Sequence, residues 1–170
     1  AAGSERFLAV VGASGSGKSS LVRAGLVPAL RWQSASANWP IYVLTPTAHP
    51  LESLAMSLIS NLGSLAGAAA LMDDLAREPR SLSLLLKHNL KPADGKHLLL
   101  VIDQFEEIFA LCRSEEERSA FIENLMAAVC DADGPAVAVI TLRADFYALC
   151  AGYPRLRQVM ARQQEFIGAM

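Results

Sequence analysis

The sequence predicts an α/β fold in which a five-stranded parallel sheet carries helices on both faces. Five short runs rich in Val, Ile, Leu or Phe alternate along the chain with longer segments of helical periodicity. Such alternation is typical of parallel strands joined by crossover helices, which cover the sheet on both sides. The run at 98–102 is apolar at all five positions, as expected of a strand buried on both faces.

The strands are expected where short apolar runs follow turn residues. Trp39-Pro40 precedes the second run, and stretches containing Pro, Asp and Gly at 91–95 and 131–135 precede the third and fourth. The fifth run is the weakest, because a glutamate stands in it. The expected strands are 7–11, 41–44, 98–102, 136–142 and 165–168.

Helices are expected in the longer segments between the strands. Ser114 followed by three glutamates is typical of a helix start, because its hydroxyl can accept a backbone N–H and the carboxylates oppose the helix dipole. The last helix is expected to break near Pro154. The expected helices are 18–26, 51–62, 64–77, 81–90, 105–112, 115–130 and 144–160.

The segment 53–72 has no charged residue and is long enough on paper to cross a bilayer. Gly63 and Gly67 even form a G-x-x-x-G pair. The segment also contains four serines and an asparagine, and Gly63-Ser64 interrupts it. We therefore expect two helices that cover a sheet, and no binding to a membrane.

The composition indicates one globular domain over residues 1–170, with room for a sizeable core. Hydrophobic residues make up 52% of the chain and charged residues 19%, and the net charge is -2. These values fit neither a polycation that binds nucleic acid nor a disordered acidic tail. No direct binding to nucleic acid is expected.

The cysteines and histidines predict no structural metal site. Cys112, Cys130 and Cys150 are 18 and 20 positions apart, no C-x-x-C pair occurs, and the three histidines lack metal-ligand spacing. The first residues, AAGSERF, lack the basic and apolar regions of a signal peptide. The expected location is the reducing cytoplasm.

A phosphate-binding motif follows the first expected strand directly. The segment Gly12-Ala13-Ser14-Gly15-Ser16-Gly17-Lys18-Ser19 matches G-x-x-x-x-G-K-[ST] at every fixed position, and a helical pattern comes after it. Its glycines allow a tight turn whose N–H groups, together with the positive end of the helix, bind phosphate. Lys18 would reach the β- and γ-phosphates of a nucleotide and Ser19 a magnesium ion, with Ser20 completing the binding loop.

Three carboxylates follow the buried run 98–102, where unpaired charge would be costly. In a fold with this motif the end of a second buried strand faces the bound magnesium, so Asp103 is expected to hold that ion through water. Glu106 is the candidate general base that polarises the attacking water. Glu107 either shares that role or only stabilises the start of the next helix.

Arg143 ends the fourth expected strand, at the edge of the sheet where the phosphates are expected. An arginine there can sense the γ-phosphate through charge-assisted hydrogen bonds. It can equally form a surface salt bridge with Asp145. The sequence alone leaves these two interpretations open.

Three segments, in this order and spacing, resemble the bacterial STAND-class NTPases. They are FLAVVGASGSGKSSLVRAGLVPAL, LLLVIDQFEEIF and ITLRADFY, and together they extend the resemblance over nearly the whole chain. More narrowly, the chain resembles the branch that is often fused to WD-repeats or other sensor and effector modules. The segments AGLVPAL, DQFEE and TLRADFY make this resemblance more specific than the phosphate-binding motif alone.

The resemblance implies a role for each matched residue and an order for the strands. Residues 12–19 become the Walker A loop, Asp103 the Walker B aspartate and Arg143 the sensor arginine. Glu106 and Glu107 fall where related NACHT domains carry an acidic pair. Gln104 stands where many relatives of the wider class have a glutamate, which implies slow hydrolysis. The implied strand order is 5-1-4-3-2.

The resemblance also implies a switch function. ATP would favour an open, oligomerising state and ADP a closed one, with Mg²⁺ bound beside the nucleotide. The expected partners are ATP or ADP, further copies of the parent protein and its other domains. Relatives usually carry an upstream segment that helps to bind the base of the nucleotide. Downstream they carry a small helical lid and a winged-helix domain. We therefore expect this chain to be the nucleotide-binding core of a larger signalling or defence ATPase.

Two other function classes are weighed against the switch. An actively turning-over P-loop NTPase would be a transporter-type ATPase or a small-molecule kinase, but the sequence shows neither an LSGGQ-like signature nor an evident acceptor lid. A nucleotide-free interaction module is disfavoured by the intact Gly17-Lys18-Ser19 and Asp103. The lack of an N-K-x-D-like motif that would recognise guanine favours ATP over GTP.

Overall fold

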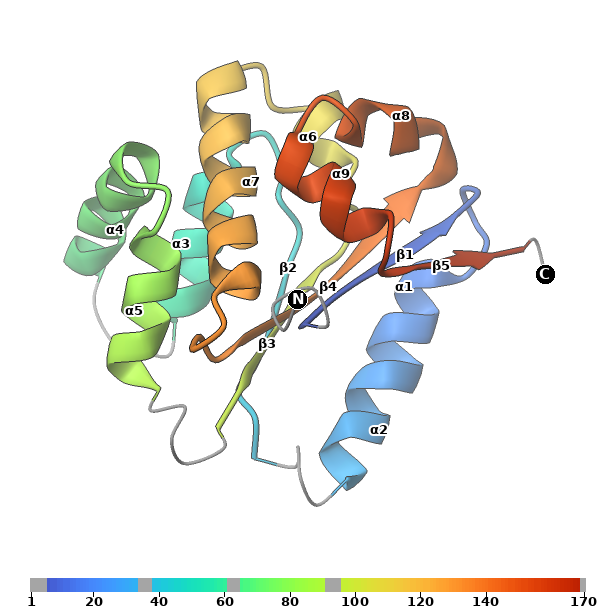
Figure 1. The fold of residues 1–170 in the computed structure, drawn as a ribbon, viewed down its shortest axis with the longest axis horizontal. Helices are drawn as coiled ribbons and strands as arrows, with labels where there is room; N and C mark the ends of the chain where they lie inside the picture. The colour runs from blue at the N-terminus through green and yellow to red at the C-terminus, as the bar shows by residue number, and fades with distance from the viewer. Residues whose placement is uncertain (1–5, 34–37, 61–64, 91–95, 169–170) are drawn as a thin grey trace.

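A single parallel sheet forms the centre of the molecule (Figure 1). The computed structural model describes residues 6–33, 38–60, 65–90 and 96–168. The strand order is β2-β3-β4-β1-β5, which is the implied order 5-1-4-3-2 named from the other edge, so the predicted α/β fold is confirmed. The strands are β1 (Phe7–Gly12), β2 (Ile41–Leu44), β3 (Leu98–Ile102), β4 (Ala136–Arg143) and β5 (Gln164–Ile167).

The strand register brings the candidate site residues to one edge of the sheet. Gly12 at the end of β1 pairs with Arg143 at the end of β4. Ile102 at the end of β3 pairs with Ile140, which lies three residues before Arg143. Because all strands are parallel, the residues that follow β1, β3 and β4 meet at the same edge.

The helices lie around the sheet on both faces. Figure 1 shows α1, η2 and α2 as one continuous rod, set apart from the group that contains α3, α4, α5 and α7. Successive residues of a strand point to opposite faces, so Leu100 belongs to the larger core cluster and Val101 to the smaller one beneath the rod. The helices are α1 (Lys18–Ser20), η2 (Leu21–Leu26), α2 (Val27–Trp32), α3 (Pro50–Ile59), α4 (Leu65–Arg77), α5 (Ser81–Asn89), α6 (Glu107–Ala110), α7 (Glu115–Cys130), η4 (Ala144–Phe146), α8 (Tyr147–Cys150) and α9 (Pro154–Met160).

The rod after the phosphate-binding motif is longer than predicted. It was expected to end near Leu26, but it passes through a π-helical segment, η2, and continues as α2 to Trp32. Within it the N–H of Val27 donates to the carbonyl of Val22, five residues back. Pro28 then falls in the first turn of α2, where its missing N–H is tolerated.

The helix predicted over 105–112 is shorter than expected. Gln104 has a φ of 56°, in the left-handed region, and the N–H of Phe105 donates to the carbonyl of Thr141. The chain therefore turns toward β4 before α6 begins at Glu107. The helix predicted over 115–130 is confirmed, and so is the break before Pro154.

The uncharged segment 53–72 contributes to two helices, α3 and α4, as predicted. The predicted interruption at Gly63-Ser64 and the predicted turn at 91–95 lie outside the described residues. Within the described part of the chain, no helix is both long enough and apolar enough to cross a membrane.

Candidate functional site

The loop between β1 and α1 has a conformation that depends on glycine. Gly17 has a φ of 87°, a left-handed value that residues with a Cβ rarely adopt. A Cβ on Gly12 would lie 2.7 Å from Ser16 Oγ and 2.8 Å from the carbonyl oxygen of Ile167, so no larger residue fits there. Two glycines that the motif requires are thus explained by backbone geometry.

Lys18 folds back over this loop. Its Nζ donates to the carbonyl oxygen of Ala13 at 2.7 Å and to Ser16 Oγ at 3.4 Å, and the residue is only 8% exposed. No carboxylate among the described residues forms an ion pair with Lys18. A largely buried ammonium whose partners are neutral favours binding of an anion beside it.

Asp103 is the centre of the hydrogen-bond network at this edge of the sheet. Its Oδ1 accepts from the hydroxyls of Ser19 and Thr141, both at 2.6 Å, and its Oδ2 accepts from Arg23 Nε at 2.8 Å. Burial would raise the pKa of Asp103, but the two hydroxyl donors and the charge of Arg23 outweigh it and hold the pKa below the ordinary value. Asp103 is therefore a buried, ionised carboxylate.

Two residues of this network, Arg23 and Thr141, were not predicted as site residues. Arg23 lies four residues after Ser19, so both side chains fall on the same face of the rod. Thr141 is a polar residue that follows the apolar run 136–140 of β4, and it is 1% exposed. Helical spacing from Ser19 and an isolated hydroxyl in a buried strand are the signals that would have found them.

The donors beside Lys18 suit a magnesium ion. Ser19 Oγ and the Asp103 carboxylate offer hard oxygen ligands, the kind that Mg²⁺ prefers. Within the described residues, no group of three or more His, Cys, Asp or Glu side chains could hold a metal alone. A magnesium ion bound by Ser19, with Asp103 holding one of its water molecules, would thus take its remaining ligands from phosphate oxygens and further water.

Glu106 and Glu107, the two glutamates after Asp103, accept hydrogen bonds from different parts of the chain. Glu106 is 9% exposed, and its Oε2 accepts from the backbone N–H of Arg143 at 3.3 Å. Glu107 Oε2 instead accepts from the backbone N–H of Thr47 at 3.1 Å. Glu106 is thus held at the end of β4, which pairs with the end of β1, whereas Glu107 joins the start of α6 to the segment between β2 and α3.

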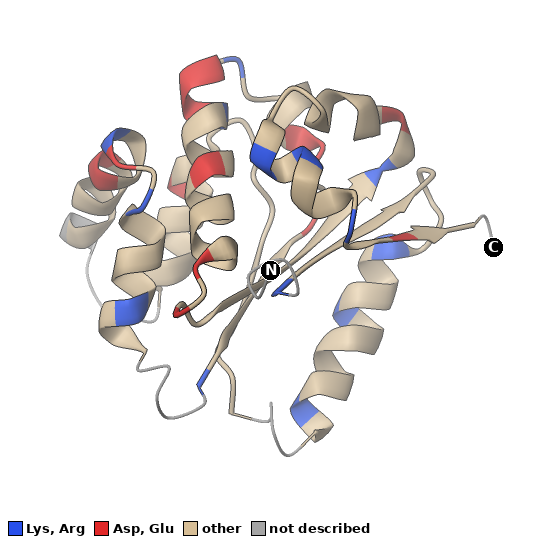
Figure 2. Cartoon of the chain, in the orientation of Figure 1, with Lys and Arg blue, Asp and Glu red and all other residues tan. Residues whose placement is uncertain are grey.

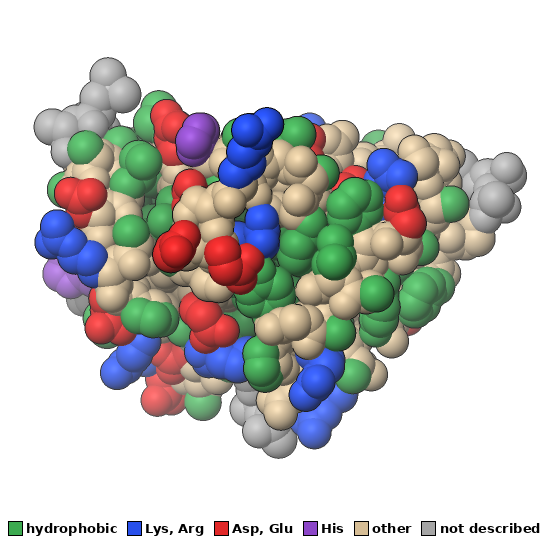
Figure 3. All heavy atoms as spheres, turned by 90° about the horizontal axis from the view of Figure 1, so that it is seen from above, with side chains coloured by type: hydrophobic (Ala, Val, Ile, Leu, Met, Phe, Trp, Pro, Cys, Tyr) green, Lys and Arg blue, Asp and Glu red, His purple; other side chains and the backbone are tan. Residues whose placement is uncertain are grey.

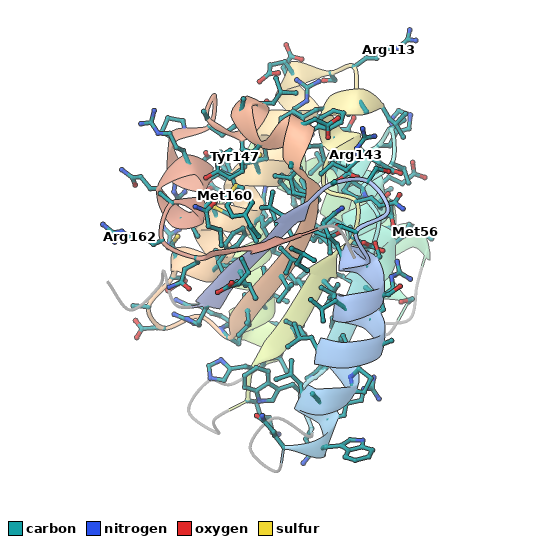
Figure 4. All side chains as sticks on the ribbon, turned by 90° about the vertical axis from the view of Figure 1, so that its right-hand side faces the viewer. Met56, Arg113, Arg143, Tyr147, Met160 and Arg162 are labelled. Atoms are coloured by element: carbon teal, nitrogen blue, oxygen red, sulfur yellow. The ribbon has the colours of Figure 1, made fainter. Side chains whose placement is uncertain are left out.

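Arg143 lies next to the loop between β1 and α1, but its side chain is paired with Asp145. Its guanidinium donates to both carboxylate oxygens of Asp145, at 3.2 and 2.7 Å, and lies 5.3 Å from the centroid of the Phe146 ring. Figure 4 shows Arg143 close to the end of β4, and its register partner on β1 is Gly12. The salt bridge considered from the sequence is formed, and the sensing role stays a prediction.

Charge is distributed unevenly around the site. The rod α1-η2-α2 carries three cations and no carboxylate, and Figure 2 shows them as blue bands along it. On the face drawn in Figure 3, acidic, basic and hydrophobic side chains are interspersed, and no single basic surface covers it. The helical rod that begins after the loop between β1 and α1 thus carries only positive charge.

Comparison with known protein families identifies the family of the chain. The sequence model of the family described as novel STAND NTPase 1 matches residues 1–170. The chain belongs to the novel STAND NTPase 1 family. The predicted resemblance to STAND-class NTPases is therefore confirmed, and the chain is an NTPase domain of this family. The comparison with curated proteins gave no match.

Solved structures with a similar fold include proteins named ORC2 and Cdc6p. The Aeropyrum pernix ORC2 protein in its ADP form has a TM-score of 0.58 at 15% identity, over 96% of this chain and 42% of that one. The same protein in its ADPNP-ADP complexes has a TM-score of 0.57 at 15% identity, over 95% of this chain and 41% of that one. Cdc6p from Pyrobaculum aerophilum has a TM-score of 0.54 at 14% identity, over 95% of this chain and 38% of that one. This novel STAND NTPase 1 chain thus shares their fold and spans less than half of their length.

Proposed function

We propose that this chain is the ATP-binding, magnesium-dependent switch domain of a longer signalling or defence ATPase. The observation that carries the proposal is the direct hydrogen bond between Ser19 and Asp103, at 2.6 Å, beside a lysine without a carboxylate partner in the described chain. Walker A serine, Walker B aspartate and phosphate-binding lysine stand together at one edge of the sheet. Membership of an NTPase family and a fold shared with an ORC2 protein solved in its ADP form support the same function.

Hydrolysis would rest on positioning and charge neutralisation. Lys18 and the N–H groups of residues 13–19 would neutralise the phosphates, and Ser19 and Asp103 would hold Mg²⁺, which stabilises negative charge on the transferred phosphoryl group. Glu106, held near the loop through the backbone N–H of Arg143, would accept the proton of the attacking water. Gln104 follows Asp103 directly, but its amide cannot act as a general base. Turnover would therefore be slow.

The switch would operate through the γ-phosphate. Arg143 ends β4, and its backbone N–H donates to Glu106. Its side chain is 41% exposed and is paired with Asp145. A γ-phosphate would compete with Asp145 for the guanidinium, since charge-assisted hydrogen bonds to phosphate are strong. ATP and ADP would then differ in whether Arg143 is drawn to the nucleotide. In the parent protein, that difference would control oligomerisation and contacts with other domains in the cytoplasm.

Isothermal titration calorimetry with ATP and Mg²⁺ tests the proposal. Lys18→Ala removes a charge-assisted contact to phosphate, so the affinity should fall about ten- to a hundredfold. The matched control is Lys96→Ala, which deletes the same charge at an exposed position before β3 and should leave affinity unchanged. Equal affinities for all three proteins, or no binding by the unaltered chain, would refute the nucleotide-binding function.

Slow turnover is tested separately from binding. A multiple-turnover assay on the full-length protein should give a rate well below the range of about 1–100 s⁻¹ that is typical of kinases. A rate in that range would favour the alternative of a working catalytic NTPase.

A further inference from the structure

Arg23 binds the carboxylate that the proposed function assigns to magnesium. Its Nε lies 2.8 Å from Asp103 Oδ2, and this is the ion pair that the structure gives to Asp103 among the described residues. Ser19 and Arg23, four residues apart on the rod, thus hold the two oxygens of one carboxylate. Arg23 lies in the π-helical segment η2, a type of distortion that often occurs at functional sites.

The two oxygens of Asp103 are not equally available. Oδ1 accepts from the hydroxyls of Ser19 and Thr141 and also from the N–H of Gln104, at 3.1 Å. Oδ2 accepts from Arg23. A water molecule bound to magnesium needs a lone pair of this carboxylate, and Oδ2 is the less occupied oxygen. The water molecule bound to magnesium and the Arg23 guanidinium therefore compete for Asp103 Oδ2.

The environments of the two partners show which of them can move. The Asp103 side chain is 5% exposed, so it needs a counter-charge where it lies. The Arg23 side chain is 51% exposed, so its guanidinium can move into solvent without loss of hydration. Lys18, the neighbouring cation, bonds to the carbonyl of Ala13 instead.

We propose that Arg23 is a resident counter-ion of Asp103 that competes with Mg²⁺ and moves into solvent when magnesium binds with the nucleotide. This inference rests on the proposed nucleotide function. It makes Arg23 a positioning residue, which keeps the Asp103 carboxylate aligned with Ser19 until the metal takes the place of the guanidinium. The affinity for Mg²⁺ is thereby lowered, and binding of the metal is coupled to release of a side chain on the rod.

Magnesium titrations in the presence of ADP test the competition. Calorimetric ADP affinity is measured at rising Mg²⁺ for the unaltered chain and for Arg23→Met, which keeps the apolar stem and removes the charge. We expect the variant to need about tenfold less Mg²⁺ for its half-maximal effect, because one charge-assisted hydrogen bond no longer opposes the metal. Arg23→Lys should lie between the two. Arg31→Met, an exposed charge deletion on α2, is the matched control and should shift nothing.

Thermal unfolding in EDTA without nucleotide tests the counter-ion role by itself. Arg23→Met should lower the melting temperature, because it leaves the buried Asp103 carboxylate without its counter-charge. In an Asp103→Asn background the same substitution should change little, since a neutral amide needs no counter-charge. An equal loss in both backgrounds would mean that Arg23 acts only through packing, and would overturn the proposal.

The two proposals fail in different ways. If the unaltered chain binds ADP with a magnesium dependence that Arg23→Met leaves unchanged or weakens, the competition is overturned and the nucleotide function stands. If no protein of the set binds nucleotide at any Mg²⁺ concentration, the nucleotide function is wrong and the competition is overturned with it.

Discussion

At the scale of single residues, the candidate site depends on how charges are partnered. The sequence was sufficient to predict that Lys18, Ser19 and Asp103 gather at one edge of the sheet, because the motif and a buried strand ending in a carboxylate determine their places. It was not sufficient for Arg23 or for the partner of Glu107. For Arg23 the local signal is its helical spacing from Ser19. The partner of Glu107 depends on side-chain directions that are set by the packed structure.

The two glutamates after Asp103 should differ in function. Glu106→Gln should keep nucleotide affinity and slow hydrolysis by about 10² to 10⁴, because the amide cannot accept a proton from water. Glu107→Gln should change the rate little, since Glu107 bonds to the backbone of Thr47 and an amide oxygen can still accept that N–H. Single-turnover hydrolysis in the full-length protein measures both. The reverse ranking would reassign the base to Glu107.

Arg143 should distinguish ATP from ADP. Arg143→Ala should weaken ATP binding about tenfold, through the loss of a charge-assisted hydrogen bond to the γ-phosphate, and leave ADP binding nearly intact. Calorimetry with each nucleotide measures this preference. Arg155→Ala is the control, because Arg155 forms a comparable exposed ion pair with Glu123. If both nucleotides lose affinity equally, Arg143 serves only its salt bridge with Asp145.

At the scale of elements, the strands were easier to predict than the helix ends. A buried strand such as β3 must be apolar at every position, so its bounds are visible in the sequence. The ends of helices depend on single residues in their tertiary setting. The rod continues through Pro28 because the proline falls in a first turn, and α6 starts late because Gln104 adopts a left-handed conformation toward β4.

A buried asparagine on α7 joins three helices. Asn124 is 0% exposed, its Nδ2 donates to the carbonyl of Leu75 on α4 at 2.8 Å, and its Oδ1 accepts from the N–H of Leu82 on α5 at 3.1 Å. Both backbone groups lie at helix ends, where helical hydrogen bonds are missing. Asn124 thus supplies a cap for each of two helices that pack on α7.

Removing this side chain should destabilise the domain. Asn124→Ala leaves a buried carbonyl and a buried N–H without partners, and each such group costs about 1 to 3 kcal/mol. We expect the free energy of unfolding to fall by about 2 to 4 kcal/mol in urea denaturation. Asn89→Ala, which removes an exposed amide bonded within its own helix, should change it by less than about 0.5 kcal/mol. Similar losses in the two variants would contradict the capping role.

At the scale of the whole molecule, the class of fold could be predicted but the order of the strands could not be derived from periodicity. Alternating strands and helices indicate a parallel sheet without saying which strands are neighbours. The order came from the resemblance to STAND-class NTPases, and the sheet β2-β3-β4-β1-β5 agrees with it. In this order β4 lies between β1 and β3, so Thr141 and Arg143 reach the site from the strand in the middle.

The three cysteines provide a test of this packed arrangement. Cys112 and Cys150 are each 2% exposed, whereas Cys130 at the end of α7 is partly exposed. Burial raises the pKa of the Cys112 thiol, and it raises the pKa of Cys150 to about 12. Since the thiolate is the reactive form, both buried cysteines should be nearly inert at pH 8.

Thiol labelling at pH 8 should therefore proceed in two stages. Cys130 should react quickly, and Cys112 and Cys150 should react only in denaturant, with the rate of global unfolding. Cys130→Ser is the control and should abolish the fast stage alone. Rapid labelling of Cys150 without denaturant would mean that this cysteine is not buried in the larger core cluster.

The stability of the domain should also depend on pH, because the pKa of Cys150 is raised in the folded state. The folded state keeps a proton that the unfolded chain loses above about pH 9, so stability should fall as the pH rises from there toward 12.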